Sequence, residues 1–211
     1  DDAKEKWRKN IISLKKIYFR FGQDIFLNQK LNKVQLNNIA KIIMGQSPPG
    51  SAYNYEGEGI PFLQGNAEFG EIFPKYKKST RITTKTANSG DILLSVRAPV
   101  GAINIADREY CIGRGLAAIA INDKDLSNYL KHALFFLKPE MERTSTGSTF
   151  KAINKEAIES LKIPFMKKNN MKDLEGKFEN ISNNIKKIQF HIQSTKNIQK
   201  QIINQIFGRK S

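Results

Sequence analysis

The stretch Ser145–Phe165, STGSTFKAINKEAIESLKIPF, marks a change of composition in this 211-residue chain. Before it, short apolar runs alternate with turn residues, and after it one long polar segment with a heptad pattern continues to the C-terminus. Asn154 predicts the start of a short helix, because its side-chain oxygen can accept an N–H group of the first turn. Residues 161–165 then alternate as in a strand, and Pro164 limits that strand to a sheet edge or to its own end.

The segment that follows predicts a long helix at 168–208. Its apolar side chains recur at spacings of four and three residues, which is the pattern of a helix-packing seam. The span from Met171 to Phe207 would be about 55 Å long at 1.5 Å per residue, and its seam needs a partner helix to cover it. The residues expected to form this seam are Leu174, Phe178, Ile181, Ile185, Ile188, Ile192, Ile202 and Ile206.

Residues 1–30 predict a second helical segment with a similar seam. Trp7, Ile11, Leu14 and Tyr18 are spaced four, three and four residues apart, and basic residues occupy the other faces. This seam is the natural partner of the C-terminal helix, in this chain or in another copy. An amphipathic basic helix can also lie on a membrane surface, but so regular a seam favours packing on another helix.

Positive charge is concentrated at the two ends of the chain. The 35 Lys and Arg residues outnumber the 20 Asp and Glu residues, for a formal net charge of +15. Residues 1–37 contribute +5 and residues 167–211 contribute +7, whereas residues 38–166 contribute only +3. The imbalance predicts attraction to polyanions, with nucleic acid first and an anionic membrane surface second. Any DNA contact in the middle of the chain must therefore come from local clusters.

The remaining composition restricts the possible classes of protein. The one cysteine, Cys111, lies in an apolar run, so we expect a buried, inert thiol, no disulfide framework and no cysteine-based metal site. No apolar run approaches the roughly 20 residues that span a bilayer, and no signal peptide is recognisable. We therefore expect a cytoplasmic protein. The chain does not begin with Met, which suggests that it was cut from something longer.

Residues 31–165 predict a globular α+β domain with a mixed sheet, and they contain several candidate DNA contacts. Lys and Arg neutralise phosphates, and hydroxyl groups and Tyr donate hydrogen bonds to them, although a solvated basic loop would have the same composition. The candidate phosphate contacts are Lys75, Lys77, Lys78 and Arg81 in one basic cluster, and Ser148, Thr149 and Lys151 in the polar loop, which is equally typical of an ordinary surface loop.

A second set of residues is expected to contact the grooves of DNA. Arg114 lies between two glycines, which would let the backbone approach a ligand and leave the guanidinium free for a bidentate contact to guanine or phosphate. The alternative is a glycine bulge with a surface arginine. The other candidates are Gln64, Asn66 and Arg97.

No catalytic arrangement is recognisable, so we expect a chain that is not itself an enzyme and holds no metal. A DNA methyltransferase needs a proline-pair motif at the target amine, and Pro48 and Pro49 lack the preceding Asn or Asp. A metal-dependent nuclease needs acidic residues that converge on Mg²⁺, but those at 173–177 lie on a helix that splays them apart. His132 and His191 lie in helical stretches without a partner constellation.

Several motifs together resemble the DNA specificity subunit of type I restriction–modification systems. They are GQSPPG, GIPFLQGNAEFG, GDILLSVRAPVG, CIGRGLAAI, GSTFKAINKEAIESLKIPF and the terminal INQIFG, in matching order from about Val34 to the end. The resemblance implies a target recognition domain at 31–165 that reads one half of a bipartite duplex-DNA site, and a conserved-region helix for spacing or dimerisation. It also implies partners, namely methyltransferase (modification) subunits and a restriction subunit, which would use S-adenosylmethionine, ATP and Mg²⁺. This chain itself would need no cofactor.

One departure from the family leaves the organisation open. Full specificity subunits usually carry two recognition domains, and this chain holds one. It would then be the second half of such a subunit, with residues 1–30 ending its central helix, or a half-length subunit that dimerises. A specificity tail of a fused type II restriction–methyltransferase is a further alternative, and so is a non-catalytic helical scaffold that binds protein.

Overall fold

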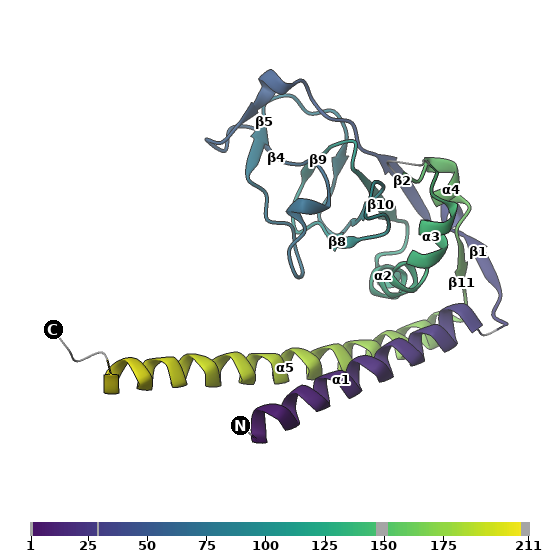
Figure 1. Cartoon of the computed structure of the whole chain (residues 1–211). Coiled ribbons are helices and arrows are strands. Elements are labelled where there is room, and N and C mark those ends of the chain that lie inside the picture. The colour runs from purple at the N-terminus through teal and green to yellow at the C-terminus, as the bar shows by residue number, and fades with distance from the viewer. Residues whose placement is uncertain (1, 29, 147–151, 208–211) are drawn as a thin grey trace.

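The computed structural model describes residues 2–28, 30–146 and 152–207, with side chains described for 5–28, 30–123, 125–146 and 152–201. A mixed α+β domain stands on a pair of long helices, α1 (Asp2–Gln23) and α5 (Lys168–Phe207), as Figure 1 shows. The α+β class and the two long terminal helices that the sequence predicts are confirmed.

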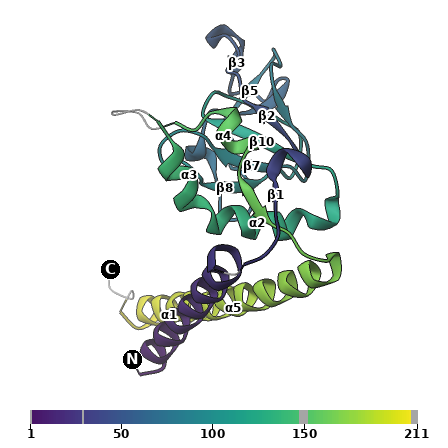
Figure 2. The same cartoon turned by 90° about the vertical axis from the view of Figure 1, so that its right-hand side faces the viewer.

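The two long helices run antiparallel. Near the start of α1, the Trp7 ring lies 6.4 Å from that of His191, and near its end the Tyr18 ring lies 5.2 Å from that of Phe178. Figure 2 shows both helices on the same side of the domain. Because α5 is much the longer helix, it continues past the start of α1 (Figure 1).

The residues predicted to pair the helices differ in how deeply they are buried. Leu174 and Phe178 are buried, because they also belong to the core of the domain. Ile202 and Ile206 belong to α5, but their side chains lie outside the described residues. The other predicted residues are half-buried: Trp7, Ile11, Leu14, Tyr18, Ile181, Ile185, Ile188 and Ile192.

The strands form three small sheets. The first pairs β1 (Lys33–Gln35) with β11 (Lys162–Pro164). The second has the order β2 (Ala40–Met44), β10 (Leu116–Ile121), β7 (Ile92–Ser95) and β8 (Ile103–Ile105). The third has the order β3 (Tyr53–Asn54), β5 (Lys78–Thr80), β4 (Ile60–Leu63), β9 (Tyr110–Ile112) and β6 (Thr86–Ala87). Only the β4–β9 pair among these strands is parallel.

Strand β7 lies between two hydrophobic clusters. Ile92 and Leu94 belong to the larger cluster, whereas Leu93 belongs to the smaller one on the other face. Neighbouring side chains of a strand point to opposite faces, so a strand buried on both faces reads as a continuous apolar run. The larger cluster is covered by α2 (Ser127–Phe136), α3 (Lys138–Thr144) and α4 (Lys155–Glu159).

The segment 34–44 forms β1, a 3-10 turn at Leu36–Asn38 and β2. Helix α2 is followed directly by α3. Pro139 lies in the first turn of α3, where its missing N–H costs no intrahelical hydrogen bond.

His132 has a partner that its position in the sequence does not indicate. The ring is 95% buried, stacks on Phe178 at 4.7 Å, and its Nδ1 lies 2.8 Å from the Tyr18 hydroxyl. Burial lowers the pKa of His132 to about 3 and raises the pKa of Tyr18 to about 12. The pair therefore joins α1 to α2 in neutral form.

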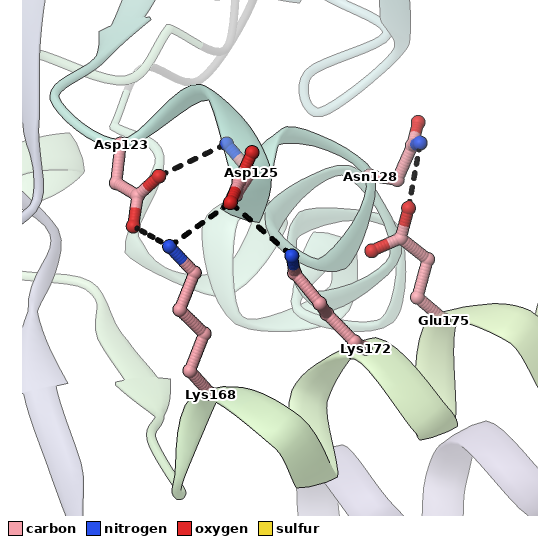
Figure 3. A network of polar contacts seen from close by, with 6 residues as sticks. All are labelled: Asp123, Asp125, Asn128, Lys168, Lys172 and Glu175. Carbon is pink, nitrogen blue, oxygen red and sulfur yellow. Dashed lines mark hydrogen bonds and ion pairs between the residues drawn. The ribbon is translucent and has the colours of Figure 1, made fainter.

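A polar network joins the start of α5 to the segment before α2 (Figure 3). Lys168 Nζ lies 2.8 Å from Asp123 and 3.0 Å from Asp125, and Lys172 Nζ lies 3.2 Å from Asp125. One turn further along, Asn128 donates to Glu175 at 2.7 Å. These contacts join the first turns of α5 to the segment before α2 and to the first turn of α2.

Candidate nucleic-acid interface

Strands β4 and β9 end at the same edge of the third sheet, because they are parallel. Beyond this edge, the Gly113 N–H donates to the Leu63 carbonyl at 2.8 Å, and the Gly115 N–H donates to the Gln64 carbonyl at 3.2 Å. The Val96 N–H, at the end of β7, donates to the Gly115 carbonyl at 3.0 Å. Three chain segments therefore meet at this place, which we call the β4–β9 edge.

The β4–β9 edge brings together three of the predicted groove contacts, Gln64, Arg97 and Arg114, which are 33 and 17 residues apart along the chain. All three side chains are exposed. Ser47 connects two of them, because its hydroxyl accepts from Gln64 Nε2 and from the Arg114 N–H, both at 3.3 Å. Sequence reasoning missed Ser47, whose surroundings indicate only a proline-containing loop.

The glycines around Arg114 have a structural role. A Cβ atom at Gly115 would lie 2.6 Å from the Gln64 carbonyl oxygen, and one at Gly45 would lie 2.1 Å from that of Gly113. Real Cβ atoms essentially never come this close to backbone. The close approach that the glycines permit is therefore one between neighbouring chain segments, and it leaves Arg114 exposed at the tip of a tight turn.

The polar loop starts and ends next to Arg97. Thr146 and Ala152 exchange two backbone hydrogen bonds of 2.9 and 3.0 Å, and Ala152 also forms a β-bridge with Arg97. The predicted phosphate contacts Ser148, Thr149 and Lys151 lie outside the described residues.

The basic cluster is divided between two ends of the sheet. Lys78 pairs with Phe62 in the antiparallel β4–β5 ladder, so Lys75 and Lys77 lie towards the Gln64 end. The Lys75 N–H donates at 2.7 Å to the carbonyl of Glu68, in the 3-10 turn Asn66–Glu68 that follows Gln64. Lys75 and Lys77 are exposed, and Asn66 is half-buried. These residues therefore flank the β4–β9 edge.

Lys78 and Arg81 are occupied by other contacts. Arg81 follows Thr80, which pairs with Ile60 at the opposite end of β4, and its Nε lies 2.5 Å from a Glu58 carboxylate oxygen. This ion pair raises the pKa of Arg81 and offsets its charge. Lys78 is half-buried, with Nζ 5.7 Å and 5.6 Å from the ring centres of Tyr53 and Tyr55.

Two further kinds of site do not occur in the described part of the chain. No group of three or more His, Cys, Asp or Glu side chains is placed there to hold a metal ion. No helix among the described residues combines the length and the apolar character that crossing a membrane requires. Cys111 is buried, as its sequence surroundings predict, with the Thr84 hydroxyl 3.6 Å from its sulfur.

Fold and site together define a class of protein, namely an α+β domain that is carried on an antiparallel pair of long helices and presents Arg, Gln and Lys side chains at one sheet edge. The family model for the type I restriction modification DNA specificity domain matches residues 28–207, and the chain belongs to that family. The resemblance seen in the sequence is thus confirmed.

Relatives and solved structures agree with this assignment. The chain is 54% identical over 125 residues to the type I restriction enzyme MjaX specificity subunit of Methanocaldococcus jannaschii, covering 59% of this chain and 29% of that protein. The HsdS subunit from Thermoanaerobacter tengcongensis has a TM-score of 0.79 at 28% identity, covering 98% of this chain and 53% of that one. A chain from a structure on complex assembly and conformational transition of the type I R-M system has a TM-score of 0.80 at 31% identity, covering 95% and 52%. The chain thus spans about half the length of these solved chains and 29% of the curated relative.

Proposed function

We propose that this chain recognises a short sequence of duplex DNA, as one half-site reader of a type I restriction–modification complex. The observation that carries the proposal is the convergence of Gln64, Arg97 and Arg114 at the β4–β9 edge in a member of a DNA specificity family. Arg makes bidentate contacts to guanine, and Gln does so to adenine, in the major groove. Lys75 and Lys77 beside them would neutralise phosphates and set the register of the duplex.

In this proposal the chain selects the site and its partners perform the chemistry. Modification subunits would supply N6-adenine methylation with S-adenosylmethionine, and a restriction subunit would supply ATP- and Mg²⁺-dependent translocation and cleavage. The chain itself would hold no cofactor and would act in the cytoplasm. The long helices α1 and α5 would space two recognition domains, either within a longer subunit or in a dimer of this chain.

Selection of bound sequences from a random duplex pool tests this function. The purified full chain is used alone and together with a modification subunit. We expect enrichment of roughly three to five base pairs, since each bidentate contact reads one base pair. A mirrored pair of motifs would show that two copies assemble. Absence of enrichment in both experiments would contradict the proposal and favour a helical scaffold that binds protein.

A further inference from the structure

The distal part of α5, residues 180–207, contains no acidic residue. It carries Lys186, Lys187, Lys196 and Lys200, all exposed. Within the described residues, no ion pair involves these four lysines. The proximal part of the helix differs, because Lys168 and Lys172 pair with Asp123 and Asp125, and Lys177 pairs with Asp173 at 2.7 Å. Ion pairs therefore neutralise lysines where α5 meets the domain, and no ion pair among the described residues does so for the lysines further along the helix.

Three of the distal lysines lie on one polar stripe of the helix. The members of the stripe follow one another at intervals of four, three, four, three and four residues. This spacing places them on one face of the helix, next to the apolar seam. It contains no large apolar side chain. Its members are Ser182, Lys186, Gln189, Gln193, Lys196 and Lys200.

The stripe begins on the side of α5 that faces the domain. Ser182 and Lys186 line a hollow of about 380 Å³ together with Asn104 of β8 and Glu71. Gln189 lines an adjoining hollow of about 300 Å³ that Glu71 also borders. From there, α5 continues beyond the domain (Figure 1). The later residues of the stripe thus extend the same face past the domain.

We propose that the stripe from Ser182 to Lys200 lies along the phosphate backbone of duplex DNA that leaves the recognition domain. This inference rests on the proposed function. Lys and amide side chains are typical phosphate contacts, and the stripe is about 27 Å long, the length of about eight base pairs. A protein partner fits less well, because the centre of a protein interface is depleted in Lys and enriched in aromatic side chains.

The test measures how DNA affinity of the full chain depends on salt. The stripe variant replaces Lys186, Lys196 and Lys200 by Gln, which keeps helix propensity nearly constant. One matched pair of single variants is Lys196→Gln, on the stripe, and Lys187→Gln, on another face of the same helix. The probes are duplexes that carry the selected motif, either trimmed close to it or extended by about eight base pairs on one side or the other.

On one extended duplex, we expect the stripe variant to reduce the slope of log affinity against log salt by about 2.7, at about 0.9 for each phosphate that is no longer neutralised. Lys196→Gln should reduce it by about 0.9, and Lys187→Gln should leave it unchanged. On the trimmed duplex, the stripe variant and the wild type should have equal slopes. Circular dichroism verifies that helix content is unchanged.

Equal slopes for the stripe variant and the wild type on both extended duplexes would overturn the inference, and a stripe that serves an acidic protein partner would give that result. If selection yields no motif, the proposed function fails, and the same comparison is made on random-sequence duplexes of the two lengths. If the stripe variant then has a smaller salt slope than the wild type only on the longer duplex, the proposed phosphate contact would still be supported.

Discussion

Arg114 is the residue at the β4–β9 edge whose removal should affect base preference most clearly. Its backbone is held by Ser47, and its side chain is exposed. We expect Arg114→Ala to relax the preference at one base position, with a loss of about 1–3 kcal/mol of discrimination. Competition between duplexes that differ at one position measures this. Arg81→Ala is the control, because Arg81 pairs with Glu58 at the other end of β4. An unchanged base preference in Arg114→Ala would remove it from the reading residues.

His132 should make stability depend on pH. Its pKa is about 3 in the folded chain and about 6.5 in the unfolded chain. Between these values the unfolded chain binds one more proton, so the free energy of unfolding falls as the pH falls, by up to about 1.4 kcal/mol per pH unit. Lowering the pH from 6.5 to 5 should therefore cost about 2 kcal/mol.

Denaturant unfolding at several pH values measures this loss. His132→Gln should remove most of it, whereas His191→Gln, at an exposed position of α5, should retain it. Lys168 lowers the pKa of Asp123 and Asp125, so their contribution is lost only at more acidic pH. If His132→Gln and the wild type lose stability identically as the pH falls, the assignment of this pH dependence to His132 would be contradicted.

At the scale of single residues, the sequence predicts contacts between residues that are close together in the chain. Asn154 caps α4 as expected, because its Oδ1 accepts from the Ala157 N–H at 2.9 Å, three residues away. The contacts of Ser47 join residues 17 and 67 positions apart, and that of His132 joins residues 114 apart. No local pattern encodes such distances, so these roles appear only in the fold.

Among the elements, α5 joins the domain mainly through apolar packing. Phe178 is 1% exposed and contacts aromatic rings of α1 and α2, including Tyr18, Phe21 and Phe136. The ion pairs of Figure 3 are exposed, and water and salt screen such pairs. We infer that the ion pairs orient α5 and that the aromatic cluster stabilises its attachment.

Phe178→Ala should therefore destabilise the chain strongly. We expect a decrease of about 3–5 kcal/mol in the free energy of unfolding, because the ring's burial is removed and a cavity is left behind. Phe190→Ala on the same helix is the matched control, because that ring is 69% exposed. Denaturant unfolding measures both variants. Similar values for the two would contradict the view that the aromatic cluster holds α5.

The long helices are predictable from sequence because their seams repeat over many residues. The short strands are less so, since β2 pairs with β10 more than 70 residues later and β7 is buried on both faces. An apolar run without alternation does not by itself distinguish a strand from a buried helix. The glycine-flanked break between β9 and β10 is predictable, because the local sequence determines it.

At the scale of the whole molecule, the β4–β9 edge and the distal part of α5 are two of the surfaces that carry positive charge. Lys75 and Lys77 flank the edge, and we expect their joint replacement by Gln to weaken binding to all DNA sequences alike. The salt slope should fall by about 1.8, at about 0.9 for each phosphate. Replacing Lys33 and Lys162 of the β1–β11 pair removes the same charge from a separate sheet and is the control. If the two double variants lowered DNA affinity and the salt slope equally, Lys75 and Lys77 would contribute only general electrostatic attraction and no specific phosphate contacts.

The placement of the domain on the helices could not be predicted from sequence. Met171, Leu174 and Phe178 follow the heptad pattern of a helix pair, yet all three also belong to the core of the domain. Their spacing is compatible with packing on α1 alone. Only the structure shows that the first turns of α5 pack on the domain and that the distal part of the helix continues past it.

The measurement that tests the central claim most directly compares sequence selection by the wild type and by a variant with Gln64, Arg97 and Arg114 all replaced by Ala. We predict that the wild type enriches a short motif. The variant should lose this motif and keep salt-dependent binding to DNA of any sequence, since Lys75 and Lys77 remain. A variant that enriches the same motif as the wild type would show that the bases are read elsewhere on the molecule.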